Sequence, residues 1–240
     1  EDDVIELLEG LMAHVVQALT GKQVETPFRR ICYEDAQLRY SSDAPDLRSD
    51  LEIFELSDLA LEMGFKVFSG AVEAGGAVRA IRVPGGGEWS RKEIESLEAI
   101  VKNQGAGGLA WMKRSDQGLA GPVARFCDNE AGAALVERSG MEVGDLCCFV
   151  ADASKRIVIN SLSFLRKELA NRLGHLKPGA LEFCWVTDFP LFDEDEESGL
   201  PVPCHHPFTS PHPEDLERLE SAPLSVRARA YDLVLNGFEG

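Results

Sequence analysis

The segment PCHHPFTSPHPEDLERLESAPLSVRARAYDLVLNGFEG spans Pro203–Gly240 and combines a rigid polar turn with a strand pattern. His205 and His206 stand side by side before a proline, which confines the residue ahead of it to extended backbone conformations. The run Tyr231–Leu235 is strand-like, and the carboxylate of Glu239 follows it closely. Paired imidazoles in a restrained turn, with a carboxylate after an apolar strand, indicate part of a polar binding site.

Simpler interpretations of these residues stay open at this point. Cys204, His205 and His206 are zinc-ligand types, as in a metallohydrolase, but successive side chains of an extended chain point to opposite faces, and structural zinc needs further ligands. Alternatively, both imidazoles form local hydrogen bonds. Glu239 is either an ordinary turn acid or a carboxylate that holds magnesium on a nucleotide phosphate. The acidic run Asp193–Glu197 is either a cation site or a solvated hairpin loop.

Composition limits the classes of function. The chain has 240 residues, of which 44% are hydrophobic, so one or two domains with a sizeable core are expected. A formal net charge of −17 argues against a general polyanion-binding surface. The six cysteines are scattered without a CxxC pair, which favours reduced thiols and a cytoplasmic location. No apolar run approaches the roughly 20 residues of a membrane span.

Working outward from the C-terminal segment, Ala180–Asp188 is predicted to be an apolar strand. At the other end of the chain, residues 4–19 have apolar side chains at helical spacing, and Gly21 is placed to end that helix. Phe28–Tyr33 is predicted to be a short strand, Tyr33–Tyr40 a short helix and Ser41–Arg48 a turn. The start at Glu1, without a methionine, suggests a piece of a longer polypeptide.

The middle of the chain has a different character and is predicted to be a compact α+β unit over about residues 57–170, with helices on one face of its strands. The expected helices are Ser90–Asn103, with Ser90 and Glu93 as a capping box, Glu130–Ser139 and Ile157–Leu173. The expected strands are Phe65–Phe68, Ala77–Val83, Leu109–Lys113, Val123–Phe126 and Leu146–Val150.

Five stretches of the chain together match one known family. They are RYSSDAPDLRSDLEI (Arg39–Ile53), KNQGAGGLAWMK (Lys102–Lys113), WVTDFPLFDEDEE (Trp185–Glu197), HHPFTSP (His205–Pro211) and AYDLVLNGFEG (Ala230–Gly240). HHPFT and YDLVLNGxE at this separation are highly specific together, and with the other stretches they make nearly the whole chain resemble the bacterial-type aspartyl-tRNA synthetases. Ser41 stands where that family usually has Gly.

The resemblance implies a class II catalytic domain, an antiparallel sheet flanked by helices, into which a GAD domain is inserted. Residues 57–170 would be this α+β insertion, and residues 1–56 and 171–240 two pieces of the catalytic domain. It also implies that His205, and more weakly His206, bind L-aspartate, and that Glu239 contacts ATP through Mg. The expected partners are tRNA(Asp), aspartate and ATP, in a homodimeric cytoplasmic enzyme without a membrane association.

The same resemblance implies what these 240 residues lack. The family activates aspartate by attack of its α-carboxylate on the α-phosphorus of ATP, a reaction that depends on positioning and on charge neutralisation by arginine and magnesium. The arginine-bearing segments of that site are missing, as are the anticodon-binding barrel and the glutamine-rich amino-acid pocket. No catalytic residue is therefore assigned, and the fragment alone is predicted to be inactive. The alternative is a GAD-type module that binds tRNA or protein without catalysis, as in subunits of tRNA-dependent amidotransferases.

Overall fold

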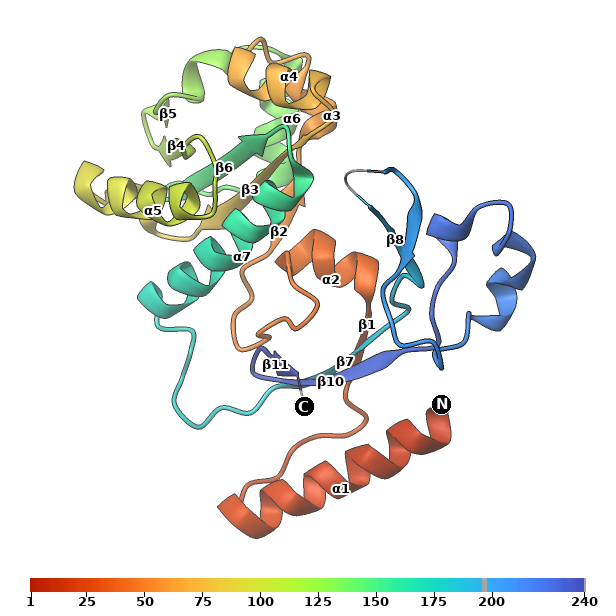
Figure 1. Cartoon of the computed structure of the whole chain (residues 1–240). Coiled ribbons are helices and arrows are strands. Elements are labelled where there is room, and N and C mark those ends of the chain that lie inside the picture. The colour runs from red at the N-terminus through yellow and green to blue at the C-terminus, as the bar shows by residue number, and fades with distance from the viewer. Residues whose placement is uncertain (196–197, 240) are drawn as a thin grey trace. The chain divides into compact units, whose positions relative to one another are not determined.

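The computed structural model describes residues 1–195 and 198–239 and divides the chain into two compact units. The first unit comprises Glu1–Ala36, Asp43–Arg48 and Pro178–Gly240, and the second comprises Gln37–Ser42 and Ser49–Lys177. The first unit therefore combines elements from both ends of the chain, which Figure 1 colours red and blue.

The first unit contains a four-stranded sheet in the order β1-β7-β10-β11, and a separate two-stranded hairpin of β8 and β9. β1 and β7 are parallel, and the other neighbours are antiparallel. α2 begins in this unit. Its elements are α1 (Asp2–Thr20), β1 (Arg29–Cys32), α2 (Tyr33–Tyr40), β7 (Phe183–Thr187), β8 (Phe192–Glu194), β9 (Pro201–Pro203), two 3-10 helices (Pro213–Arg218 and Pro223–Ser225), β10 (Tyr231–Leu235) and β11 (Phe238–Glu239).

Helix α1 covers one face of this sheet (Figure 1). Its buried residues Ile5 and Val16 belong to one apolar cluster with Phe183 and Trp185 of β7. The carboxylate of Glu9 lies under the helix and accepts hydrogen bonds from the Trp185 indole Nε1, at 2.9 Å, and from a backbone N–H, at 3.1 Å. The helix ends as predicted, because the next residue, a glycine, has a φ of 70°.

The second unit contains a five-stranded antiparallel sheet in the order β2-β3-β6-β4-β5. The α+β class predicted from the sequence is confirmed. The elements of the second unit are β2 (Ile53–Glu55), α3 (Ser57–Ala60), α4 (Lys66–Glu73), β3 (Ala77–Val83), a 3-10 helix (Gly86–Glu88), α5 (Arg91–Asn103), β4 (Ala110–Ser115), β5 (Gly118–Ala120), a second 3-10 helix (Ala124–Phe126), α6 (Glu130–Ser139), β6 (Leu146–Asp152) and α7 (Lys155–Arg172).

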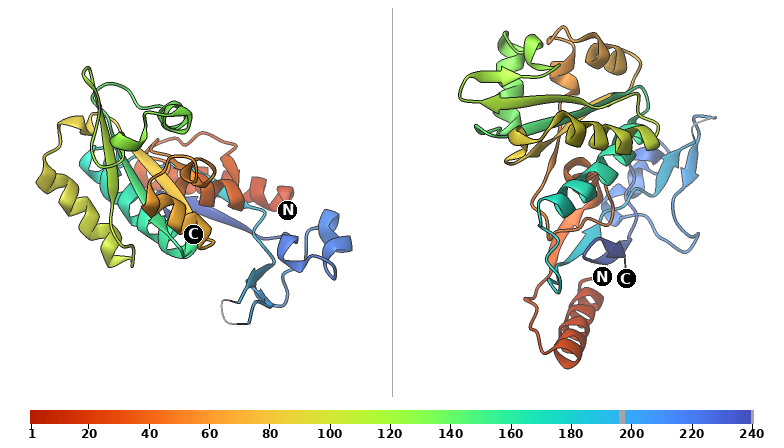
Figure 2. Two further views of the ribbon diagram at one scale, coloured as in Figure 1. Left: turned by 90° about the horizontal axis from the view of Figure 1, so that it is seen from above. Right: turned by 90° about the vertical axis from the view of Figure 1, so that its left-hand side faces the viewer.

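The prediction that helices cover one face of these strands is wrong, because both faces are covered (Figure 2). Ile81 and Val83 of β3 lie in one cluster with residues of α5 and α7. Their neighbours Val78 and Ala80 lie in a second cluster with residues of α3, α4 and α6. Adjacent side chains of a strand point to opposite faces, so a strand buried along its length needs cover on both sides.

Two of the short strands predicted from the sequence are also wrong. Phe65–Phe68 leads into α4, whose buried Phe68 and Ala71 are three positions apart and so lie on one helical face. Val123–Phe126 contains a 3-10 helix instead of a strand. Both segments are short apolar runs, for which periodicity does not separate helix from strand.

Ser41 is expected to be a point of strain in the turn after α2. Its φ is 50°, its side chain is 2% exposed, and its hydroxyl oxygen lacks a hydrogen-bond partner among the described residues. The left-handed backbone costs about 1–2 kcal/mol and the buried hydroxyl about 1–3 kcal/mol, against about 0.5–1 kcal/mol for the greater freedom of glycine in the unfolded chain. Ser41→Gly should therefore raise the free energy of unfolding by about 1 kcal/mol or more, measured by urea denaturation. Ser42→Gly is the matched control, since its φ is not positive, and an equal gain in both variants would contradict the explanation.

All six cysteines are free thiols. Among residues 1–195 and 198–239, none of the helices has both the length and the apolar character that crossing a bilayer requires.

Candidate functional site

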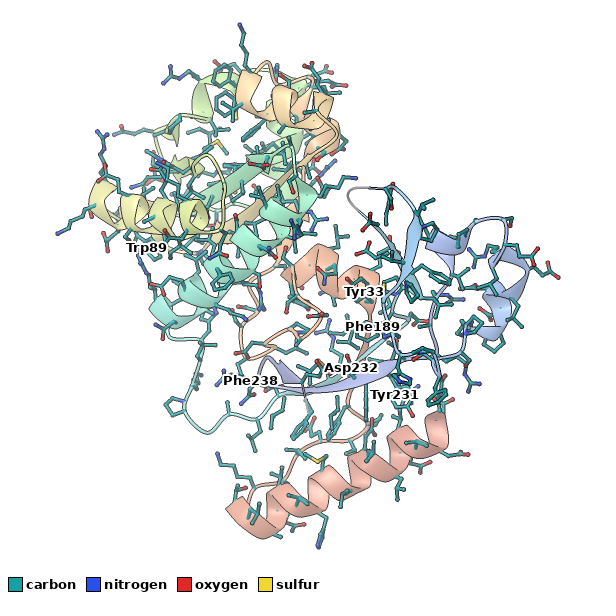
Figure 3. All side chains as sticks on the ribbon, viewed as in Figure 1. Tyr33, Trp89, Phe189, Tyr231, Asp232 and Phe238 are labelled. Atoms are coloured by element: carbon teal, nitrogen blue, oxygen red, sulfur yellow. The ribbon has the colours of Figure 1, made fainter. Side chains whose placement is uncertain are left out.

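The face of the first unit's sheet opposite α1 carries two carboxylates on neighbouring strands. Val234 of β10 pairs with Glu239 of β11, and Asp232 lies two residues before Val234. Residues two apart on a strand share a face, so Asp232 and Glu239 are diagonal neighbours on it. Tyr231, next to Asp232, instead packs with the α1 cluster, and Figure 3 shows the two side chains on opposite sides of β10.

The electrostatics of Asp232 show which groups lie near it. Partial burial raises the pKa of the Asp232 carboxyl, and the negative charges of Glu239 and Asp43 raise it further, while His205 acts in the opposite direction. These groups come from β10, β11, the turn after α2 and the loop after β9. The fold of this unit therefore brings His205 and Glu239, 34 positions apart in the sequence, into the field of one carboxylate.

The turn between β10 and β11 fixes the position of Glu239. Asn236 and Gly237 both have positive φ, 54° and 84°, as a two-residue hairpin turn of this hand requires. The side-chain amide of Asn236 donates to the carbonyl of Ala180 at 2.8 Å and accepts from the N–H of Glu182 at 2.9 Å. A Cβ at Gly237 would lie 3.0 Å from the Cβ of Asp46, so the loop that precedes β2 packs directly on this turn.

His205 is half-buried beside the sheet. Its Nε2 lies 3.1 Å from the carbonyl oxygen of Pro190, and a carbonyl oxygen only accepts, so Nε2 carries the proton. Its ring meets the ring of Phe189 edge-on at 5.8 Å, and Phe189 in turn lies 5.2 Å from Tyr33 (Figure 3). These contacts hold the imidazole in one orientation. Nδ1 of His205 has no hydrogen bond within the described part of the chain.

His206 and Cys204 do not share the environment of His205. His206 is exposed, its Nδ1 accepts a hydrogen bond from the N–H of Phe208, and its ring lies 4.7 Å from that exposed phenyl ring. Cys204 is exposed as well. The pKa of its thiol is raised, mainly by partial desolvation and to a smaller extent by the negative charge of Asp193. No group of three or more metal-ligating side chains is present in residues 1–195 and 198–239. The two imidazoles therefore lie in different environments, that of His205 half-buried against Phe189 and that of His206 exposed against Phe208.

The first residues of the acidic run, Asp193 and Glu194, belong to the β8–β9 hairpin, which agrees with the hairpin interpretation for this described part of the run. β8 pairs with β9, and Asp193 and Glu194 are exposed. The last two residues of that run, Glu196 and Glu197, lie outside the described residues.

Asp232 is the residue of this face that the sequence analysis missed. The sequence does contain an indication of Asp232, because this acid interrupts the apolar run Tyr231–Leu235. It lies two positions before Val234 and therefore on the same face of the strand. Recognising it requires knowing that β11 follows β10 as a tight hairpin, which brings Glu239 back beside the same face.

Comparison with known proteins extends the family resemblance to the whole chain. A model of the GAD domain matches residues 68–162. The chain is 47% identical over 240 residues to an aspartate–tRNA ligase of Halalkalibacterium halodurans. It is 46% identical over 238 residues to an aspartate–tRNA(Asp/Asn) ligase of Heliobacterium modesticaldum, and 44% identical over 240 residues to one of Bacillus cytotoxicus.

These matches cover 99–100% of the chain but only 39–41% of each relative. The chain thus spans about 40% of the length of the curated relatives that it matches. The chain therefore carries a GAD domain and is homologous, over its entire length, to a part of the bacterial aspartate–tRNA ligases.

Proposed function

We propose that these 240 residues serve in an aspartate–tRNA ligase, which activates L-aspartate with ATP to aspartyl-adenylate and transfers the aspartyl group to tRNA(Asp). The observation that carries this proposal is the similarity to such ligases over all 240 residues, which include both structural units. Within the chain we propose the GAD insertion at 57–170, between catalytic-domain pieces at 1–56 and 171–240. The match of the GAD model to residues 68–162 supports this division.

We assign Glu239 to ATP binding, and we add Asp232 beside it. Two carboxylates on one sheet face fit magnesium, which typically takes one or two protein carboxylates together with phosphate oxygens. Bound there, magnesium would neutralise charge on the ATP phosphates. The residues themselves concentrate negative charge on this face, and the pKa of Asp232 is raised first by its partial burial and then by the charges of Glu239 and Asp43.

His205 is assigned to the aspartate substrate. Its ring is oriented by the Pro190 carbonyl and by Phe189, and Nδ1 is the nitrogen left for a ligand. His206 is the weaker candidate for the same pocket, because its Nδ1 is occupied by the N–H of Phe208. The roles of both residues are to bind and orient the substrate, and no covalent step is assigned to either.

The partners follow from this reaction. They are tRNA(Asp), aspartate and ATP, and the resemblance further leads us to expect a homodimer that works in the cytoplasm. The alternative, a GAD-type binding module without catalysis, is not favoured, because the similarity to the ligases extends well beyond residues 68–162 on both sides.

The test uses a hybrid ligase, in which these 240 residues replace the matching segment of the Halalkalibacterium halodurans relative. We expect aspartate-dependent exchange of pyrophosphate into ATP and charging of tRNA(Asp) by the hybrid, with the isolated 240 residues at background. A folded hybrid that retains the relative's dimeric state but shows no aspartate-dependent exchange would contradict the proposal. Clear exchange by the isolated 240 residues would contradict the predicted inactivity of the fragment.

A further inference from the structure

Asp215 is a fully buried carboxylate in the otherwise exposed 3-10 helix Pro213–Arg218. Its Oδ2 accepts hydrogen bonds from the backbone N–H of Arg227 at 2.9 Å and from the Arg227 Nε at 2.8 Å. Its Oδ1 accepts from the Arg227 Nη2 at 3.1 Å and from the guanidinium of Arg218. The hydrogen bonds from the side chain and the backbone of Arg227 hold the pKa of Asp215 well below its usual range.

Arg227 connects this carboxylate to two other segments. Its Nη1 lies 3.3 Å from Asp188, at the end of β7, and its Nη2 lies 2.9 Å from Glu214 and 3.3 Å from the Nδ1 of His212. The guanidinium therefore contacts acids from both sides of its own strand, which is a stronger arrangement than a single surface ion pair.

The backbone around Arg227 runs between the same two segments. On one side, the N–H of Ala228 donates to Phe189 at 2.7 Å and the N–H of Leu191 donates to Val226 at 2.8 Å. On the other side, the N–H of His212 donates to the carbonyl of Arg227 at 2.7 Å. Residues 226–228 thus form the middle of a short three-stranded ladder, whose outer members are 189–191 and 210–212.

His205 depends on one outer member of that ladder. Its Nε2 bonds to the carbonyl of Pro190, and its ring packs on Phe189. The residue before it, Cys204, donates its N–H to the carbonyl of Leu191 at 3.0 Å. Any shift of residues 189–191 therefore shifts the imidazole.

We propose that Asp215 and Arg227 are positioning residues, which hold segment 188–191 in place and thereby set the orientation of the His205 imidazole for aspartate binding. This inference rests on the proposed function for its catalytic consequence, but the placement of the imidazole is a property of the chain itself. Phe189, Leu191 and Val226 of these segments are buried, and the charged cluster adds charge-assisted hydrogen bonds to the apolar contacts that they make. A buried carboxylate that loses its partners is costly, and this makes the cluster act as a unit.

The first test uses the 240-residue chain and NMR of its histidine rings. In the unmodified chain we expect a His205 Nε2 proton that exchanges slowly with solvent, because it is bonded to Pro190. In Asp215→Asn we expect that protection to fall by roughly tenfold or more, with the indole signals of the second unit, from Trp89 and Trp111, unchanged. Glu217→Gln, an exposed neighbouring acid, is the control and should leave His205 unchanged. Equal protection of His205 in Asp215→Asn and in the unmodified chain would overturn the proposal.

The second test uses the hybrid ligase. We expect Asp215→Asn to raise the KM for aspartate roughly tenfold while the KM for ATP stays within about twofold, because only the imidazole is displaced. In a folded Asp215→Asn hybrid, an equal rise in the KM for ATP would indicate a merely structural role and overturn the proposal. If Asp215→Asn does not fold, Arg218→Gln removes one of the donors to Asp215 and should show the same selective change at smaller size. An inactive unmodified hybrid would count against the proposed function alone, because the histidine experiment decides the positioning independently.

Discussion

Replacing Glu239 with glutamine in the hybrid ligase is expected to lower the rate of aspartate-dependent pyrophosphate exchange by about 100-fold or more. Glutamine keeps the shape of the side chain and removes its charge, and loss of one such electrostatic contact typically costs 10²- to 10³-fold, about 2.7–4 kcal/mol. The reason lies in the register, since Glu239 and Asp232 face the same side of the sheet and share one field. The measurement is the exchange rate over a titration with magnesium, because a lost carboxylate should raise the magnesium concentration needed.

Asp232→Asn provides the partner measurement. Because the two carboxylates act on one ligand, their contributions to the exchange rate should not be additive. The rise in activation free energy of the Asp232→Asn/Glu239→Gln double variant should be smaller than the sum of the rises in the two single variants. Glu182→Gln is the control, since Glu182 is exposed and lies in the same unit just before β7. Additive losses of exchange activity in the Asp232 and Glu239 variants would contradict a shared site. An exchange rate of the Glu239→Gln hybrid within about twofold of that of the unmodified hybrid would contradict it as well.

A second large effect is expected in the second unit, where Arg166 of α7 is 3% exposed. Its Nε donates to the carbonyl of Leu51 at 2.7 Å and its Nη2 to the carbonyl of Ser49 at 2.9 Å. Its guanidinium lies 4.8 Å from the centre of the buried Tyr40 ring. Arg166 therefore satisfies two buried carbonyls and stacks on an aromatic ring over which the Arg39 guanidinium also lies, 5.3 Å from the ring centre.

Arg166→Met should lower the free energy of unfolding of this unit by about 3 kcal/mol, since the two carbonyls lose charged donors in a place that water does not reach. Thermal and urea unfolding, followed by the fluorescence of Trp89 and Trp111, measure the change. Lys167→Met is the matched control, because Lys167 is the exposed neighbour on the same helix and should shift stability by less than about 0.5 kcal/mol. Equal effects of the two substitutions would show that the buried contacts are not what stabilises this region.

The features that could be predicted from the sequence are those fixed by local chemistry. Ser90 and Glu93 form the predicted capping box, with both reciprocal hydrogen bonds present at the start of α5. Gly21 ends α1 in the left-handed conformation that glycine allows. The strand Tyr231–Leu235 has the predicted bounds, because its composition and the Asn-Gly turn after it act together.

The wrong predictions of secondary structure and of sheet coverage share one physical cause. Tertiary contacts decide whether a short apolar segment forms a helix or a strand and which of its faces is buried. Phe68 is buried in α4, and its ring centre lies 5.7 Å from that of Phe149 in β6. The four residues Phe65–Phe68 alone do not predict this contact. The second covered face of β3 was missed for the same reason, because AVRAIRV also fits a strand with one solvated face.

The candidate site was predictable only in part. The motif around His205 and the carboxylate of Glu239 are visible in the sequence, but the role of Asp232 depends on which residues share a face after the hairpin closes. The same holds for Asp215. In the sequence it is one of several acids in an acidic segment, and its burial depends on the contact with Arg227, which lies 12 positions later in the chain.

We propose that Asp232 and Glu239 form one cation-binding face for ATP. Crystals of the hybrid ligase grown with manganese and a non-hydrolysable ATP analogue test this, because manganese takes the place of magnesium and is located by its anomalous scattering. We predict an anomalous peak about 2.1 Å from a carboxylate oxygen of Glu239, with Asp232 contacting the ion directly or through one water. A peak bound to the nucleotide on a different surface, with both carboxylates facing solvent, would contradict the account.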